Sequence, residues 1–383
     1  MEITPAELKT YAPGSYAVLD IRPADELSYG TIPGAVHFER TRLQDTPPED
    51  REKLYVLCAR NTEEGLKAAE TLERTGRRAA ALSGGYGAWV LEDLKDQSGE
   101  SIRETAERSL RKKFRKPIWG AFTKALKLYH LVNEGDCVAV CISGGKDSML
   151  LAKLFQELER YSDVPFTAKY ICMDPGYSPA NRQIIEENAR NLGIPIQFFE
   201  TDIFSSVFNV EKNPCYLCAR MRRGYLYSFA SKLGCNKIAL GHHYDDVIET
   251  ILMSMLYGSQ IQSMMPKCHS ENYGGMELIR PMYFVREDDI RRWRDYNGLH
   301  FLQCACRFTE ENISLYDEKQ QNSKRLEAKK LIRELKKTNP DIEAHIFRSM
   351  ENVNIDMVLS YKQNGVMHSF LDDYDKKEQK NDT

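Results

Sequence analysis

The sequence lacks any long hydrophobic run. Nowhere do about 18 apolar residues follow one another, so we expect no membrane-spanning helix. The first residues, MEITPAELKTY, contain two glutamates and no apolar stretch, so we expect no secretory signal and a cytoplasmic protein. Positive and negative residues are nearly balanced, since the formal net charge of the 383 residues is −3. A nucleic-acid partner would therefore have to bind local basic patches.

Internal repeats are also absent. The composition, with 42% hydrophobic and 28% charged residues, is that of an ordinary globular protein and excludes a mainly disordered or collagen-like chain. At roughly 100–200 residues per domain, the length predicts two or three domains.

Ten cysteines in a cytosolic chain of this length are better explained as buried residues, metal ligands or reactive thiols than as disulfides. Five are interpreted as structural: Cys137, Cys141, Cys172, Cys235 and Cys268. The candidates for chemistry lie in loop-like contexts: Cys58, Cys215, Cys218, Cys304 and Cys306.

Short apolar runs predict a small α/β domain over residues 1–96. Its expected elements are the strands Tyr16–Ile21, Leu54–Cys58 and Ala79–Leu82 and the helix Thr62–Thr75. The polar stretch 97–118 follows, with six basic residues between Arg108 and Lys116. We interpret this stretch as an interdomain linker with a basic helix.

Strands and helices alternate in a second domain over residues 119–316. The expected strands are 137–142, 168–174, 194–200 and 237–241, and the expected helices are 149–161 and 180–192. This alternation predicts a parallel, doubly wound sheet. We expect helices over 317–370 and a charged, frayed tail over 371–383.

The strongest chemical signal is a glycine-containing loop between a predicted buried strand and a predicted helix. Its residues are Ser143, Gly144, Gly145, Lys146, Asp147 and Ser148. Glycines let the backbone approach an anion, and a helix N-terminus adds oriented N–H groups. The spacing is not that of a Walker A loop. The loop resembles the pyrophosphate-binding loop of the N-type ATP pyrophosphatases.

A second polar cluster follows the predicted strand at 237–241. Its residues are Gly241, His242, His243, Asp245 and Asp246. They stand where α/β proteins bind ligands, and the carboxylates suit Mg²⁺ on the phosphates of a nucleotide. The alternative is a helix cap, in which an aspartate accepts backbone N–H bonds. Asp174 ends another strand and is a candidate nucleotide contact or a turn-forming residue.

Two pairs of cysteines have the spacing of metal or cluster ligands. Cys215 and Cys218 stand in the run PCYLC, and Cys304 and Cys306 in FLQCACRF. Such thiolates bind zinc or iron–sulfur clusters, although a CxxC pair alone is also typical of redox sites. Three ligands would leave one iron of a four-iron cluster open, whereas four would indicate a closed zinc site.

From Asp136 to about Phe370 the sequence resembles the tRNA 2-thiocytidine synthetases, within the family that thiolates tRNA bases. The resemblance rests on SGGKDS, PCYLCARMRRGYLY, IALGHHYDD, IRPMYFVRE and the late cysteines. It implies ATP, Mg²⁺ and a [4Fe-4S] cluster held by Cys215, Cys218 and one of Cys304 or Cys306. The family usually separates its late cysteines by two residues, whereas this chain has CAC.

The N-terminal domain resembles a rhodanese. The runs VLDIRPADELSYGTIPGAVHF and LSGGYGAW and the strand-end Cys58 carry this resemblance. It implies a persulfide on Cys58, and a thiol facing helix N–H groups is expected to gain thiolate character. Glu63 and Glu64 at the helix start would oppose a nearby thiolate. An inert rhodanese-like binding module is the alternative.

Basic side chains gather in four runs: Arg108–Lys116, Arg220–Arg223, Arg286–Arg294 and Lys324–Lys337. Beside a domain that resembles an RNA thiolase, they suit a surface that follows the phosphates of RNA. The alternative is a set of solvated helix faces. Tyr225, Tyr227 and Tyr257 are available for base stacking or for the core.

Together the resemblances imply a tRNA sulfurtransferase with its own sulfur carrier. The fold would be an α/β rhodanese-like domain followed by a doubly wound, adenine nucleotide α-hydrolase-like domain with a helical C-terminus. ATP adenylates a base oxygen, O2 of an anticodon-loop cytidine, and sulfur from Cys58 replaces it. Lys146, Asp245 and Asp246 are the other expected catalytic residues. Expected partners are tRNA and a cysteine desulfurase, and a homodimer stays open.

Several rival functions remain at this point. The same ATP chemistry serves thiouridine synthetases and amidating or lysidine-forming ligases, although ligases need no thiol cluster. A persulfide-binding regulatory protein with a four-cysteine zinc site is a non-catalytic alternative. Transfer of sulfur to a small molecule is compatible with the net charge of −3.

Overall fold

The computed structural model describes residues 1–12, 14–27, 30–96, 99–201, 214–270, 272–301, 324–372 and 374. By its contacts the chain divides into two compact units. The first is Met1–Asp246 with Met265–Gln320, and the second is Val247–Met264 with Gln321–Thr383. No helix in the described part of the chain is long and apolar enough to cross a membrane.

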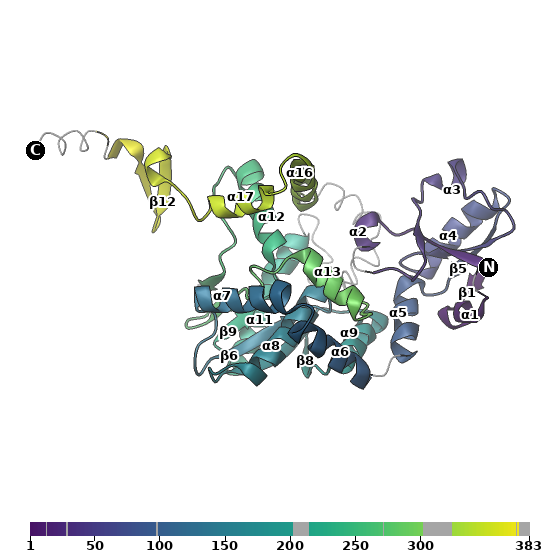
Figure 1. Cartoon of the computed structure of the whole chain (residues 1–383), viewed down its shortest axis with the longest axis horizontal. Helices are drawn as coiled ribbons and strands as arrows, with labels where there is room; N and C mark the ends of the chain where they lie inside the picture. The colour runs from purple at the N-terminus through teal and green to yellow at the C-terminus, as the bar shows by residue number, and fades with distance from the viewer. Residues whose placement is uncertain are drawn as a thin grey trace, which may run out of the picture. The chain divides into compact units, whose positions relative to one another are not determined.

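The N-terminal domain is a parallel five-stranded sheet with the strand order β1-β5-β4-β2-β3 (Figure 1). Its strands are β1 (Glu2–Ile3), β2 (Tyr16–Asp20), β3 (Val36–His37), β4 (Leu54–Cys58) and β5 (Arg78–Leu82). Its helices are α1 (Pro5–Thr10), α2 (Ala24–Leu27), α3 (Arg42–Asp45), α4 (Thr62–Glu73) and α5 (Gly85–Asp96). The three predicted strands and the predicted helix are confirmed.

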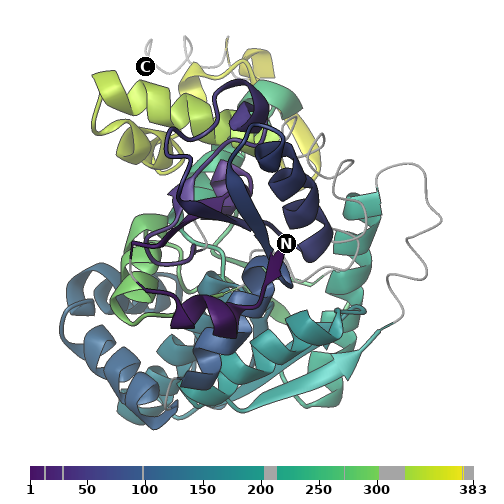
Figure 2. The same ribbon diagram turned by 90° about the vertical axis from the view of Figure 1, so that its right-hand side faces the viewer.

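Two apolar clusters cover the faces of this sheet. Every residue of β4 is buried, and its side chains alternate between the cluster that includes Val56 and the cluster that includes Leu57. This explains why LYVLC is a continuous apolar run, since a parallel strand is buried on both faces. Asn61 caps α4 by accepting a hydrogen bond from the Glu64 N–H. The N-terminal strand faces the viewer in Figure 2.

The second sheet has six strands in the order β10-β11-β9-β6-β7-β8. They are β6 (Cys137–Ile142), β7 (Thr167–Asp174), β8 (Ile196–Glu200), β9 (Lys237–Ala239), β10 (Lys267–His269) and β11 (Glu277–Ile279). Five strands are parallel, and only β10 at the edge is antiparallel. The helices that accompany the sheet are α8 (Lys146–Tyr161), α9 (Pro179–Leu192), α11 (Pro214–Lys232), α12 (Tyr244–Gly258) and α13 (Glu287–Tyr296). The predicted doubly wound parallel sheet is confirmed.

The strand order of this sheet reverses between β6 and β9. From β6 the chain adds β7 and β8 on one side, and it then returns to place β9 on the other side. In such folds, ligands bind at the carboxyl ends of the two strands that flank the reversal. The loop at 143–148 follows β6 and the cluster at 241–246 follows β9, so both predicted motifs stand at this point.

The stretch 97–118, predicted as an interdomain linker with a basic helix, is mostly helical in its described residues. It contains α6 (Gly99–Arg111) and the start of the π-helix η1 (Arg115–Gly120), and α7 (Ala121–Tyr129) follows it. The side chains of Leu110, Phe114 and Ile118 are buried. α6 packs against α9. Its apolar residues recur at helical spacing, whereas the basic residues that suggested a linker lie on the outer face.

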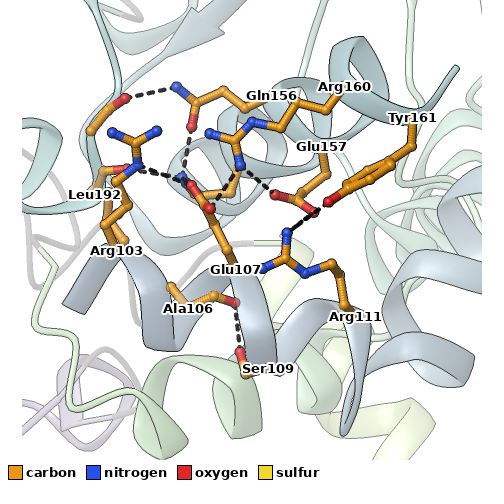
Figure 3. A network of polar contacts seen from close by, with 12 residues as sticks. Arg103, Ala106, Glu107, Ser109, Arg111, Gln156, Glu157, Arg160, Tyr161 and Leu192 are labelled. Carbon is orange, nitrogen blue, oxygen red and sulfur yellow. Dashed lines mark hydrogen bonds and ion pairs between the residues drawn. The ribbon is translucent and has the colours of Figure 1, made fainter. Parts of the chain in front are cut away.

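A buried ionic network fastens α6 to α8 (Figure 3). Glu107 accepts hydrogen bonds from Lys153 at 2.9 Å and Arg160 at 2.7 Å. The fully buried Lys153 ammonium also donates to the Leu192 carbonyl and to Gln156. Burial acts to raise the pKa of Glu107, but the hydrogen bonds from Arg160 and Lys153 outweigh it and lower the pKa to about 2.

The C-terminal segment differs from the all-helical prediction. After α16 (Lys324–Thr338), α17 (Ile342–Ser349) and the short η2 (Ile355–Met357) come two paired strands, β12 (Ser360–Gln363) and β13 (Val366–Ser369). A short η3 (Phe370–Asp372) follows the second strand. The turn residues Asn364 and Gly365 both have positive φ, the geometry of a two-residue hairpin turn. The dipeptide Asn-Gly was the overlooked signal, and residues 375–383 of the predicted tail lie outside the described residues.

Candidate active site

The loop after β6 has the backbone that an anion-binding turn needs. Gly144 has φ +84°, and a Cβ at this position would lie 2.5 Å from Cγ1 of Ile185 in α9, so a larger residue would clash there. Gly145 is extended and precedes the first residue of α8, Lys146. The N–H groups of the first turn of α8 therefore point out of the helix toward the loop.

The two serines brace this loop. The Ser148 hydroxyl donates to the Gly145 carbonyl at 2.9 Å and accepts from the Ser143 N–H at 3.1 Å. The Ser143 hydroxyl lies 3.2 Å from the Ser148 hydroxyl. These bonds hold the turn in a fixed shape, which reduces the entropy lost when a phosphate group binds.

Lys146 is buried rather than extended into solvent. Only 1% of the residue is exposed, and its ammonium lies 3.0 Å from Oδ2 of Asp147 and 3.4 Å from Oε1 of Glu287. Glu287 in turn pairs with Arg291 at 2.7 Å. A buried cation needs such partners, because removal from water without them is costly. The sequence interpretation missed Glu287, whose place beside Lys146 depends on a contact between α13 and α8.

The structure brings the polar cluster after β9 against the same loop. A Cβ on Gly241 would lie 3.2 Å from the Asp147 carbonyl carbon and 3.3 Å from the Ser148 nitrogen, so the absent side chain permits the close approach. The buried His243 places Nε2 3.9 Å from Oδ1 of Asp147. His242 lies half-buried just before it. The two predicted motifs thus form one site.

Asp245 and Asp246 bind backbone groups in this structure. Oδ2 of Asp245 accepts from the Glu287 N–H at 2.8 Å, and Arg286 lies 3.3 Å from its Oδ1. Oδ2 of Asp246 accepts from the His243 N–H at 3.0 Å, as a cap of α12. Asp246 therefore acts as a helix cap, the alternative considered from the sequence. Asp245 connects α13 to the site.

Asp147 has a carboxylate oxygen available for a ligand. Its Oδ1 is buried and makes no hydrogen bond to any described residue. Among the side chains that the structure describes, no three His, Cys, Asp or Glu residues are grouped to hold a metal by themselves. Mg²⁺ commonly takes only one or two carboxylates and completes its shell with water and substrate phosphates. The donor set at Asp147 fits that mode of binding.

Asp174 at the end of β7 is occupied by local bonds. Its Oδ1 accepts from the N–H groups of Gly176 and Tyr177 at 2.8 and 2.7 Å, and its Oδ2 pairs with Arg182 at 2.6 Å. These contacts correspond to the turn-forming role considered for Asp174.

Cys58 ends β4 and is fully buried in the apolar cluster with Val56. Burial raises the pKa of its thiol, Asp20 raises it further, and Arg22 opposes the increase. In this structure burial therefore opposes the expected gain in thiolate character. Arg22 is itself held by Asp20, at 2.6 Å.

The glycines of LSGGYGAW pack against the segment after Cys58. A Cβ on Gly85 would lie 2.5 Å from the Ala59 carbonyl oxygen, and the Tyr86 N–H donates to that same oxygen at 2.9 Å. The Gly84 N–H donates to the Thr62 hydroxyl at 2.8 Å. This contact explains why two consecutive glycines, both with positive φ, stand here.

Comparison with known proteins agrees with both the domain that contains the glycine loop and the domain that contains Cys58. The PP-loop domain family matches residues 118–306, and the rhodanese-like domain family matches residues 4–92. The tRNA-cytidine(32) 2-sulfurtransferase of Syntrophotalea carbinolica is 36% identical over 60% of this chain and 86% of its own length. The chain belongs to the tRNA-cytidine(32) 2-sulfurtransferase family.

Other relatives have the same name. The tRNA-cytidine(32) 2-sulfurtransferase of Vibrio parahaemolyticus is 33% identical over 67% of this chain and 82% of its own length. Among solved structures, the U34-tRNA thiolase NcsA from Methanococcus maripaludis with its [4Fe-4S] cluster aligns at 18% identity. That alignment covers 73% of this chain and 81% of NcsA, with a TM-score of 0.45.

In this member of the family, the cysteines proposed as ligands are only partly described. Cys215 and Cys218 lie three positions apart in the first turn of α11. Cys304 and Cys306 lie outside the described residues. Of the five cysteines interpreted as structural, Cys141, Cys172 and Cys235 are buried, Cys137 is only half-buried, and Cys268 is exposed.

Proposed function

We propose that the protein is an ATP-dependent tRNA sulfurtransferase, which adenylates O2 of an anticodon-loop cytidine and replaces that oxygen by sulfur. One observation carries the proposal: in a member of this family, the glycine loop and the buried Lys146 stand at the strand-order reversal with His243 beside them. This is the place where a doubly wound sheet binds a nucleotide.

ATP binds with its phosphates against residues 143–148. The base oxygen attacks the α-phosphorus and forms a P–O bond, while the bond to the bridging oxygen breaks and pyrophosphate leaves with its electron pair. The loop N–H groups and the Lys146 ammonium stabilise the charge that develops on the phosphates. Glu287 and Asp147 hold the ammonium in place for this role.

The oxygen of the adenylated base is a good leaving group. The terminal sulfur of a persulfide attacks the adenylated carbon and forms the new C–S bond, while the C–O bond breaks and AMP leaves with the electron pair. A thiol reductant then attacks the carrier sulfur of the resulting base–S–S–Cys disulfide, the S–S bond breaks and the thiocytidine leaves. A second thiol of the reductant restores the free cysteine. We propose Cys58 as the persulfide carrier and a cysteine desulfurase as the source of its sulfur. Since Cys58 is fully buried, loading requires the segment after β4 to open.

Two cofactors accompany this chemistry. We propose Asp147 as a ligand of Mg²⁺, in preference to Asp245 and Asp246, because Oδ1 of Asp147 makes no hydrogen bond to a described residue. Mg²⁺ would neutralise charge on the phosphates. We propose Cys215, Cys218 and one of the two late cysteines as ligands of a [4Fe-4S] cluster. Three cysteine ligands would hold the cluster and would leave one iron without a protein ligand, so the cluster would supply a site for sulfur.

The test combines two readouts on the purified protein. With tRNA, ATP and a persulfide donor, wild type is expected to form AMP and a thiocytidine detected by nucleoside mass spectrometry. Lys146→Ala is expected to lower the rate of AMP formation by about 10²–10³-fold. Lys67→Ala, which removes an exposed lysine of α4, is the control and is expected to retain the wild-type rate.

Three outcomes would contradict the proposal. A thiouridine instead of a thiocytidine would reassign the base. AMP formation without any thionucleoside would favour a ligase. Zinc without iron after anaerobic purification, and no ATP turnover with RNA, would favour the regulatory protein.

A further inference from the structure

One exposed surface has a high density of positive charge. It is formed by the turn that follows α6, the π-helix η1 and α7. Its cations, which we call the basic face, are Lys112, Lys113, Arg115, Lys116, Lys124 and Lys127, and all six are exposed. No aspartate or glutamate occurs between Arg111 and Asn133, so the chain supplies no neighbouring negative charge in this stretch.

The basic face differs from the basic residues of α13 and α16 in its lack of ion pairs with described carboxylates. None of its six cations pairs with a carboxylate of any described residue, whereas the arginines of α13 and the lysines of α16 are largely neutralised. The pairs in those helices include Arg291–Glu287, Arg292–Asp289, Lys324–Glu327, Lys329–Glu249, Lys336–Glu343 and Lys337–Glu334. The unpaired charges of the basic face therefore remain available for an anionic partner.

The basic face also contains an open pocket of about 500 Å³. The residues that line it are Lys112, Lys113, Arg115, Lys116, Trp119, Gly120 and Thr123. The pocket lies along the π-helix η1, in which Pro117 has no N–H and the Trp119 N–H donates to the Phe114 carbonyl, five residues back. The half-buried Trp119 places an aromatic side chain among the cations.

A short segment connects the basic face to the site on the glycine loop. The Lys124 ammonium lies 4.4 Å from the centre of the Phe284 ring, and the Tyr129 ring stacks on Phe284 with 5.7 Å between the ring centres. Two and three residues later in the chain, Arg286 contacts Asp245 and Glu287 contacts Lys146. The face and the candidate active site are therefore joined by residues 284–287.

We propose that the basic face binds the sugar–phosphate backbone of the RNA substrate beside the adenylation site. This inference rests on the proposed function. Cations spaced along one helical surface match the regular charges of a phosphate backbone, and an aromatic ring in the pocket can stack on a base. An acidic protein segment could pair with the same cations, but its binding would not explain why the basic face is connected to the ATP site.

The test measures how tRNA binding depends on salt. In a quadruple variant, Lys112→Gln, Lys113→Gln, Arg115→Gln and Lys116→Gln remove four cations of the face. We expect its tRNA affinity to fall about tenfold or more. The slope of log Kd against log salt should decrease by about 3, since each lost phosphate contact contributes about 0.7–0.9.

The control removes four lysines that are already paired, all in α16: Lys324→Gln, Lys329→Gln, Lys336→Gln and Lys337→Gln. It changes the net charge equally and is expected to keep the wild-type slope. Circular dichroism and the unfolding temperature of both variants check the fold. If both variants lose affinity equally, the effect is one of net charge and the inference is wrong.

The remaining outcomes separate this inference from the proposed function. If wild type binds and thiolates tRNA while the quadruple variant keeps its affinity and its salt slope, the basic face does not bind RNA and the proposed function stands. An acidic protein would then be its partner. If wild type itself fails to bind tRNA, both the inference and the proposed substrate are wrong.

Discussion

At the scale of single residues, Lys146 and Glu287 show how the site depends on contacts between distant parts of the chain. The sequence predicts Lys146 because it stands in a recognisable motif, a glycine-containing loop between a strand and a helix. Glu287 belongs to no recognisable sequence motif. It becomes part of the site only because α13 packs against α8. The same limit explains why Asp147 was considered only as part of the glycine loop, whereas Asp245 and Asp246 were expected to act on ATP.

We predict that Glu287→Gln lowers kcat for AMP formation about tenfold, as expected when one charge-assisted contact to a catalytic group is lost. The substitution removes the charge of one of the two carboxylates, Asp147 and Glu287, that lie within 3.4 Å of the Lys146 ammonium, so the ammonium is held less firmly. The matched control is Asp288→Asn, which changes the exposed neighbour of Glu287. Steady-state measurements of kcat and KM test the prediction, and an equal effect of both substitutions would contradict it.

The buried thiol of Cys58 leads to a second prediction. Burial and Asp20 raise its pKa, so the thiol should react slowly with iodoacetamide in the native protein. The exposed Cys268 serves as the internal reference. Mass spectrometry of alkylated peptides should show rapid labelling of Cys268 and slow labelling of Cys58, and equal labelling of both in urea. Fast native labelling of Cys58 would mean that the open conformation dominates in solution.

At the scale of secondary-structure elements, periodicity and turn signals predicted most strands and helices of both domains, but not β10, β11 and α13. The stretch 97–118 was interpreted as a linker with a basic helix. The structure has the helix, and its apolar residues are buried against the domain. The hairpin at 360–369 was missed because the Asn-Gly turn was not weighed against the helical pattern that precedes it.

The network between α6 and α8 should make an unusually large contribution to stability. We predict that Glu107→Gln lowers the free energy of unfolding by about 3–5 kcal/mol, because it leaves the buried Lys153 without its carboxylate. Glu104→Gln is the control, since Glu104 is exposed on the same helix and 3.9 Å from Arg108. Urea unfolding at neutral pH measures both variants, and similar losses would contradict this account.

The same network gives a prediction for pH. The pKa of Glu107 is lowered from 4.5 to about 2, so its ionised form is favoured in the folded protein. Its contribution to stability is therefore complete above pH 4.5 and is lost as the pH falls toward about 2. The difference in unfolding free energy between wild type and Glu107→Gln should shrink across this interval. A difference that does not change with pH would mean that Glu107 acts through packing alone.

At the scale of the whole molecule, helix α9 connects the rhodanese-like domain to the PP-loop. Both domains belong to the first compact unit, in which α5 and α9 lie side by side (Figure 1). Ile184 belongs to the apolar cluster that contains Trp89. Its neighbour Ile185 packs so close to Gly144 that a Cβ on Gly144 would clash with it. Adjacent residues of one helix therefore contact the rhodanese-like domain and the glycine loop.

His300 completes this contact. Its ring meets the Trp89 ring edge to face at 5.1 Å, its Nε2 lies 3.5 Å from Asp93, and its carbonyl accepts from Asn188 at 2.9 Å. Burial lowers the pKa of the imidazole, although Asp93 opposes this. Under the proposed function, a rhodanese-like domain held in this way would act as an intramolecular sulfur donor.

We therefore predict that His300→Ala uncouples the two half-reactions. Because the substitution weakens the contact between the domains and leaves Lys146 and its partners in place, less thionucleoside should form for each AMP released. His269→Ala, which removes an exposed histidine, is the control and should keep the wild-type ratio. Nucleoside mass spectrometry and AMP measured in the same reaction give this ratio. Two outcomes would contradict the prediction: a parallel fall of thionucleoside and AMP, or no change of either in a folded variant. Sulfur would then reach the base by a route that does not depend on this contact, and Cys58 would not be the intramolecular donor.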